Sequence, residues 1–202
     1  MASRFGLSAR KEPRQERGRR RVTRLLRAAE QVIAESGYEG ATMCAIARRG
    51  GSAVGSLYQF FPNKDALADA LRESFTKEYE EFWRVGRLGG QKLEVEPLTE
   101  RLLTFPVAMA QRHPAFLPLL DLPPSRHSHR RHERMRRRIA AILRLGRPWL
   151  SRAQALRLAG VLRQVLKAFL TLYARATPTE RQRIVEEFKL LLAAYLHARL
   201  KE

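Results

Sequence analysis

Hydrophobic residues recur every three or four positions along most of the chain, which is the spacing of helices with one buried face. The first such run places six apolar side chains on one face: Val22, Leu25, Leu26, Ala29, Val32 and Ile33. Gly37 follows where a residue with left-handed backbone geometry would end the helix. No stretch of useful length alternates apolar and polar residues as a strand does. The pattern therefore predicts an all-α fold.

Two short helices are expected after the first. Thr42 can cap a second helix, which Gly50 and Gly51 stop within two turns, and a third helix then carries Val54, Leu57 and Tyr58. Beyond Pro62, Asn63 can cap a fourth helix that runs to about residue 85.

The remainder also has helical periodicity, over about 97–112, 115–120, 127–145 and 151–176. Thr177, Pro178 and Glu180 supply the N-cap, N1 and N3 residues of a capping box for a last helix. The 151–176 helix is apolar on most sides, so one face can meet its own core while another meets a partner. Association of subunits is therefore expected.

The charge is strongly positive, with 39 Lys and Arg against 20 Asp and Glu, a net +19 that attracts polyanions. Residues 1–18 are basic and poor in apolar side chains, which predicts a flexible arm. Cys44 is the single cysteine, so an intrachain disulfide and a cysteine-based metal cage are excluded, and a reducing cytoplasmic location is expected. No apolar run reaches the roughly 20 residues of a membrane span, and the first 21 residues lack a secretory signal.

The stretch from Thr42 to Leu67 carries the functional signal, because two short helices joined by a glycine turn form a helix-turn-helix. Small side chains at the start of its second helix would let that end approach base edges in a major groove: Ala53, Val54, Gly55 and Ser56. Lys64, at a helix N-terminus, opposes the helix dipole and suits a phosphate contact, as does the Tyr58 hydroxyl. The alternatives are a solvated lysine and a tyrosine packed in the core.

Leu25 to Leu67, and especially Ile46-Ala47 and the run VGSLYQFFPNKDAL, closely resembles the N-terminal domain of the tetracycline-repressor (TetR) family. The resemblance implies that Thr42 caps the second helix and touches phosphate, and that Tyr58 and Lys64 grip the DNA backbone. It also implies that the positions of the third helix that face the groove are Ala53 to Ser56 and Gln59. It further implies a homodimer formed through the last two helices, and a cavity for a small-molecule effector in the C-terminal domain.

These observations predict a three-helix DNA-binding domain over 19–68 and a larger helical effector-binding and dimerisation domain over 69–202. The expected function is a repressor that an effector releases from a palindromic double-stranded operator. Tyr58→Phe and Lys64→Ala are expected to weaken operator binding while the fold stays intact. The alternative is a basic helical protein that binds nucleic acid without reading its sequence. No nucleotide-binding, hydrolase or zinc-protease motif occurs, so neither an enzyme, a cofactor nor a metal is expected.

The turn departs from the family pattern, which usually reads Ala-Gly-Val-Ser where this chain has Gly50-Gly51-Ser52-Ala53. Ser52 replaces an apolar plug and either buries a hydroxyl or leaves a gap. Ala53 replaces a capping serine that also reaches DNA, unless Ser52 caps the helix through a one-residue shift.

Two basic segments leave alternatives open. Arg17, Arg19, Arg20 and Arg21 could enter a minor groove, lie along phosphates, or belong to a tail without contacts. The segment 126–138, with His127, His129, His132 and seven arginines among its residues, fits an effector anion site, a metal site, an extra DNA contact or a solvated helix face.

Six aromatic or methionine side chains are candidates for the effector cavity, although such a side chain at helical spacing is more often ordinary core. They are Phe105, Met109, Phe116, Trp149, Phe169 and Tyr173.

Overall fold

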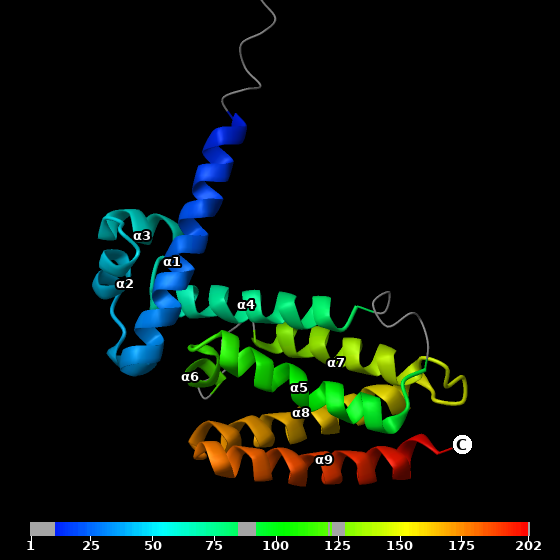
Figure 1. Ribbon diagram of the computed structural model, residues 1–202. Coiled ribbons are helices and arrows are strands. Elements are labelled where there is room, and N and C mark those ends of the chain that lie inside the picture. Colours follow the sequence, from blue (N-terminus) through cyan, green and yellow to red (C-terminus); the bar gives the residue numbers. More distant parts are fainter. Residues whose placement is uncertain (1–10, 85–91, 121, 123–127, 202) are drawn as a thin grey trace, which may run out of the picture. The chain divides into compact units, whose positions relative to one another are not determined.

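The computed structural model describes residues 11–84, 92–120, 122 and 128–201, with side chains from Glu16 onward. Within these residues all regular structure is helical, in nine helices without a strand (Figure 1). The predicted all-α fold is confirmed. The chain divides into two compact units, Met1–Leu71 and Arg72–Glu202.

The first unit contains α1 (Lys11–Gly40), α2 (Met43–Arg49), α3 (Val54–Phe60) and the first turns of α4 (Lys64–Phe82). Helix α1 packs against α2, and α2 packs against α3. The predicted apolar faces meet in its core, where the side chains of Leu25, Ile33, Ile46 and Leu57 are fully buried.

Helix α1 begins at Lys11, which is earlier than predicted, so residues 11–18 are helical and do not form a flexible arm. Residues 1–10 of the predicted arm lie outside the described residues. Lys, Arg, Glu and Gln are good helix formers although they give no apolar periodicity. An ion pair one turn apart, between Arg20 and Glu16 at 2.5 Å, supports this end of the helix.

Gly37 interrupts α1 as predicted, with φ of 70° and ψ of 171°. Glycine adopts a positive φ without the steric cost that a Cβ brings. One further helical turn follows before Thr42 starts α2.

The second unit contains the rest of α4, α5 (Val95–Arg112), α6 (Phe116–Leu120), α7 (Ser128–Arg144), α8 (Arg152–Arg175) and α9 (Pro178–Leu200). Helix α7 packs along α8, α5 packs along α9, and α8 packs along α9 (Figure 1). Thr177 caps α9 by accepting a hydrogen bond from the Glu180 amide at 3.4 Å. A capping box with both of its hydrogen bonds begins α8, at Ser151 and Gln154.

Candidate DNA-binding interface and regulatory domain

Thr42 starts α2 as predicted. Its backbone is extended, with φ of −114° and ψ of 150°, and its hydroxyl accepts a hydrogen bond from the Ala45 amide at 3.1 Å. The first turn of α2 has no acidic residue that would repel a phosphate. The cap leaves Thr42 exposed at the N-terminal end of α2.

The two glycines of the turn are needed for different reasons. A Cβ on Gly50 would lie 3.0 Å from the Leu25 side chain and 3.3 Å from the Ile46 carbonyl oxygen, so Gly50 allows α2 to approach α1 closely. Gly51 has open space around it but a φ of +56°, a backbone conformation that favours glycine. The turn therefore fixes both the spacing and the direction of the chain entering α3.

The N-cap of α3 is Ala53, whose extended backbone carries no side-chain hydrogen bond. Ser52 does not take over this role, because its hydroxyl is buried and has no hydrogen-bond partner among the described residues. The chain thus lacks the helix cap that the family pattern supplies, and it buries a polar group where that pattern has an apolar plug.

Helix α3 presents a small, polar face to solvent. Leu57 is fully buried, whereas Ala53, Gly55, Tyr58 and Gln59 are exposed. Val54 and Ser56 are half-buried. The Tyr58 side chain is 49% exposed, which excludes its packing in the core of this subunit.

Lys64 is neither a solvated lysine nor a free cation. Its Nζ donates hydrogen bonds to the carbonyl oxygens of Tyr38 at 2.8 Å and Glu39 at 3.1 Å, and lies 4.4 Å from the centre of the Tyr38 ring. These carbonyls belong to the C-terminal end of α1, where the helix dipole favours a cation. The position of Lys64 therefore has a structural reason within the subunit, so Lys64→Ala is expected to lower stability as well as to remove a phosphate contact.

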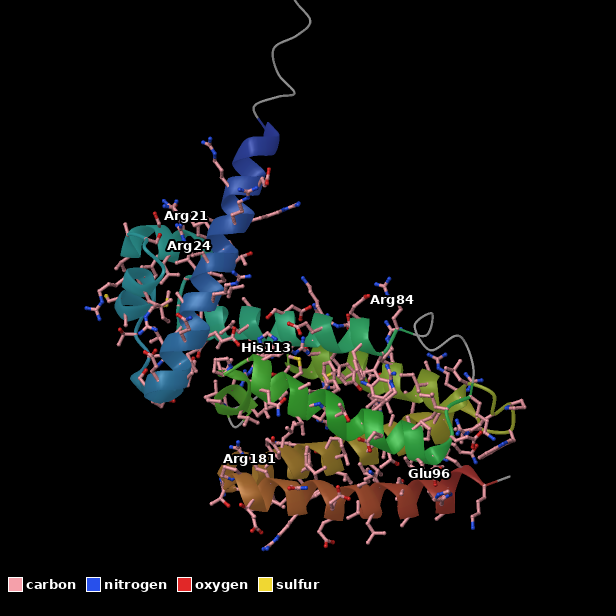
Figure 2. The ribbon with its side chains drawn as sticks, viewed as in Figure 1. Arg21, Arg24, Arg84, Glu96, His113 and Arg181 are labelled. Atoms are coloured by element: carbon pink, nitrogen blue, oxygen red, sulfur yellow. The ribbon has the colours of Figure 1, made fainter. Side chains whose placement is uncertain are left out.

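Arginines of α1 and a side chain of α3 form a basic groove in the first unit. Its lining residues, here named the α1 groove, are Arg17, Gly18, Arg20, Arg21, Arg24 and Phe60. The side chains of Arg21 and Arg24 leave α1 on the side of α3 (Figure 2). Arg20 is paired with Glu16, but Arg17, Arg21 and Arg24 have no ion pair within the described part of the chain. Arg19 is also exposed.

The six candidate effector residues have different neighbours in the second unit. Phe105 belongs to a ring cluster with Tyr79 and Phe82, at centroid distances of 5.4 and 4.6 Å, and Met109 is fully buried. Phe116 meets Phe75 at 5.5 Å.

The remaining three candidates lie elsewhere in the second unit. Phe169 stacks near Tyr173 and Phe188, at 5.6 and 5.3 Å. Trp149 lies at the rim of a separate surface pocket of about 200 Å³ that also includes Arg157 and Arg199.

Residues 128–138 of the basic segment form the N-terminal two thirds of α7, and Arg126 and His127 lie outside the described residues. Ile139, Ile142 and Leu143 point into the core, as the helical spacing predicts. Glu133 accepts hydrogen bonds from Arg136 at 2.9 Å and Arg137 at 2.8 Å. The part of the chain that the structure describes holds no group of three metal-ligating side chains.

Sequence reasoning missed a set of buried polar atoms at the end of α4 and the start of α5. The Tyr79 hydroxyl, Trp83 Nε1 and Arg101 Nε are buried without a hydrogen-bond partner in the described residues. The spacing of Tyr79 and Trp83, four positions apart at the end of α4, is the one signal of this set in the sequence.

Among the described helices, none combines the length and the apolar composition that a membrane span requires.

Comparison with known proteins agrees with this architecture. Residues 25–71 match the family described as bacterial regulatory proteins, tetR family, and residues 96–196 match the tetracyclin repressor-like C-terminal domain. A comparison with curated protein sequences gave no significant match.

Solved structures with the same fold cover nearly all of the chain. A TetR-family transcriptional regulator from Streptomyces coelicolor is 28% identical, with a TM-score of 0.71 over 89% of this chain and 99% of the other. A TetR-family regulator from Pectobacterium atrosepticum is 22% identical, with a TM-score of 0.68 and coverage of 94% and 98%. The regulator FadR from Bacillus subtilis, solved with stearoyl-CoA, is 18% identical, with a TM-score of 0.60 and coverage of 85% and 97%.

One matched region falls in each compact unit, and the helix-turn-helix lies within the first region. The chain therefore belongs to the TetR family and is a DNA-binding transcriptional regulator, with an N-terminal helix-turn-helix and a helical C-terminal domain.

Proposed function

We propose that the protein is a repressor that binds a palindromic operator as a homodimer and leaves it when a small-molecule effector binds. The observation that carries the proposal is the exposed face of α3, where small side chains stand beside a half-exposed tyrosine. We assign DNA binding to residues 19–68, and effector binding and dimerisation to 69–202.

In this proposal the N-terminal end of α3 enters a major groove. Base edges are contacted by the exposed or half-buried residues of α3 and its N-cap, which are Ala53, Val54, Gly55, Ser56 and Gln59. Ser52 can approach the DNA only through its backbone, because its hydroxyl is buried. Thr42 and Tyr58 bind phosphate oxygens through their hydroxyls. Lys64 joins them through the third N–H of its ammonium, because two are donated to the carbonyls of α1.

Arg19, Arg20 and Arg21 stand on a helix and therefore cannot follow a groove as an extended arm does. They act together with Arg17 and Arg24 as phosphate contacts along the backbone next to the half-site. This role depends on the positive charge of the arginines along α1 and requires no recognition of bases.

Dimerisation is assigned to the outer faces of α8 and α9. These faces expose apolar side chains that water solvates poorly: Val161, Leu172, Leu190 and Leu191. Two copies joined through these helices would bury them in a four-helix bundle. The twofold symmetry of such a dimer matches the inverted repeat of an operator.

The effector response is supported by a related fold, since the Bacillus subtilis regulator FadR was solved with stearoyl-CoA. Release requires only that an effector bind more tightly to the subunit arrangement that does not fit the operator.

The experiment is selection of bound sites from random double-stranded DNA, followed by affinity measurement on the selected site. An inverted repeat that survives excess competitor DNA is expected, and Tyr58→Phe should lower its affinity about tenfold through loss of a phosphate contact in each subunit. Tyr195→Phe, which removes a hydroxyl from α9, should leave the affinity unchanged. Recovery of unrelated sequences would instead favour the alternative of a polyanion-binding protein, which rests on the net charge of +19.

A further inference from the structure

The end of α4 and the first half of α5 hold four buried polar groups without a described partner, in Tyr79, Trp83, Thr99 and Arg101, and those of Tyr79, Trp83 and Arg101 lie together. The Tyr79 and Trp83 ring centroids are 6.2 Å apart, and the Arg101 guanidinium lies 5.5 Å from the centre of the Trp83 ring. The Tyr79 hydroxyl, Trp83 Nε1 and Arg101 Nε have no hydrogen-bond partner in the residues that the structure describes. Buried polar groups are nearly always hydrogen-bonded, so three such groups in one place require an explanation.

All three groups are donors. An indole N–H and a guanidinium N–H can only donate, and burial raises the pKa of Tyr79 far above its ordinary value, so its hydroxyl keeps its proton. The missing partner must therefore offer acceptor atoms.

The same place carries positive charge. Arg101 and Arg138 are both half-buried, and neither has an ion pair within the described ranges of the chain. Arg138 of α7 lies close enough to Tyr79 for its charge to act on that hydroxyl. Arg101 donates one hydrogen bond to the Phe82 carbonyl oxygen, at 3.3 Å, and an anion would balance the charge of both arginines.

Aromatic rings surround these groups. Phe82 lies 4.6 Å from Phe105 and beneath the Arg101 guanidinium at 4.5 Å, and Tyr79 meets Phe105 edge to face at 5.4 Å. Phe82 and Arg101 are half-buried, whereas Tyr79 and Trp83 lie deeper, at 6% and 1% exposure. A flat aromatic body makes favourable edge and face contacts with such rings.

We propose that Tyr79, Trp83, Arg101 and Arg138 form a binding site for a small aromatic carboxylate in the second unit. The carboxylate oxygens accept hydrogen bonds from the unpartnered donors, and the two arginines balance its charge. The inference names the ligand class of the effector response proposed above, and it rests on that proposal only for its regulatory consequence.

The test is isothermal titration of the full-length protein, without DNA, using 2-naphthoate and its methyl ester. Saturable binding of 2-naphthoate is expected, with the uncharged ester at least about tenfold weaker. Because Trp83 belongs to the site, the ligand should also change the tryptophan emission of the wild type but not that of Trp83→Phe.

Substitutions at single arginines test whether 2-naphthoate binds at the proposed site. Arg101→Gln and Arg138→Gln should each weaken 2-naphthoate binding about tenfold. Arg84→Gln is the matched control, because Arg84 follows the same helix but is exposed and paired with Glu81 at 2.6 Å (Figure 2). Circular dichroism checks that each variant is folded. If Arg101→Gln does not fold, the affinity of Arg138→Gln for 2-naphthoate tests the site.

Absence of saturable binding would mean that water satisfies the donors, and it would overturn the proposal. Equal affinity for acid and ester, or unchanged affinity in a folded Arg138→Gln variant, would do so as well. The result is independent of the repressor proposal. Binding of 2-naphthoate without operator release supports the site and contradicts its role in induction, whereas failure to bind an operator contradicts only the DNA-binding proposal.

Discussion

Ser52 and Ala53 show how two residues can weaken a local fold while leaving its geometry intact. The turn still places Leu57 in the core and starts α3 at Val54. However, α3 lacks a side-chain cap, and the Ser52 hydroxyl is buried without a partner among the described residues. Both features should lower the stability of the DNA-binding unit.

Replacing these two residues should therefore stabilise the protein. Ser52→Val removes the buried hydroxyl and should raise the free energy of unfolding by about 1–2 kcal/mol. Ala53→Ser restores a cap and should add about 1 kcal/mol. Urea denaturation measures both changes. Ser52→Thr is the control, since it adds the same methyl group but keeps the hydroxyl; an equal gain from threonine and valine would refute the explanation.

Lys64 is expected to affect both stability and DNA binding. Lys64→Ala should lower the free energy of unfolding by about 1 kcal/mol, because it removes two hydrogen bonds at the end of α1. Tyr58→Phe should leave stability unchanged, because the side chain is exposed. Thermal or urea unfolding of the two variants separates these effects. If Lys64→Ala unfolds like the wild type, the bonds to Tyr38 and Glu39 contribute nothing measurable.

The helices themselves were predicted well, because apolar periodicity and end signals agree along most of the chain. Thr42, Gly37 and Thr177 mark helix ends in the sequence and in the structure. The start of α1 was misjudged because charged residues that favour helix formation carry no apolar pattern. A solvated helix and a flexible basic arm have the same composition, and only backbone hydrogen bonding distinguishes them.

The basic face of α1 should bind DNA electrostatically. Arg21→Gln and Arg24→Gln should each weaken binding to operator and non-operator DNA alike. Each should reduce the slope of log affinity against log salt by about 2, because both subunits of the dimer lose one phosphate contact. Arg183→Gln, at an exposed position of α9, is the control and should not change the slope. Affinity measured across a salt series tests this. A loss confined to the operator, with the slope unchanged, would indicate base recognition instead.

Helix α7 should make stability depend on pH through His132. Partial desolvation, and the charges of Arg163, Arg131, Lys167 and Arg72, lower its pKa from the ordinary value of 6.5. The unfolded chain therefore takes up the proton first as the pH falls below about 6.5, so this contribution to stability is present at higher pH and is lost as the pH falls toward the folded-state pKa.

His132→Gln should remove that part of the pH dependence. Unfolding free energies of the variant and the wild type, measured from pH 7.5 down to about 5 around the ordinary histidine pKa, should differ most at the acidic end, with the variant losing less. Parallel curves for the two proteins would show that His132 does not titrate differently on folding.

The DNA-binding candidates lie on one short stretch of sequence, so their neighbourhood follows from the helix-turn-helix pattern. The neighbours of the effector candidates cannot be predicted in this way, because tertiary packing decides which apolar side chains become neighbours. Phe105 joins a ring cluster with Tyr79 and Phe82, whereas Trp149 lies in a surface pocket. An unpartnered donor such as Trp83 Nε1 can be recognised only after every surrounding acceptor has been placed.

Dimerisation should depend on the exposed leucines of α9. Leu190 and Leu191 are 69% and 49% exposed, and introducing a charge there as Leu190→Glu with Leu191→Glu should convert a dimer to monomers. Sedimentation equilibrium measures the state, and operator affinity should fall with it. Gln182→Glu adds a charge at an exposed polar position of the same helix and should leave the dimer intact. A dimer that persists in the double variant would place the interface elsewhere.

A hydroxyl-radical footprint on a selected operator, in the presence of competitor DNA, addresses DNA recognition most directly. Two α3 helices held by a twofold dimer should protect two symmetric half-sites whose centres lie about 34 Å, or one helical turn, apart. At a protein concentration near the wild-type Kd, Tyr58→Phe should weaken both protected regions together, because its affinity is about tenfold lower. Uniform protection along the DNA, or a footprint that Tyr58→Phe leaves unchanged, would contradict the assignment of α3 and its neighbouring tyrosine as the DNA-reading surface.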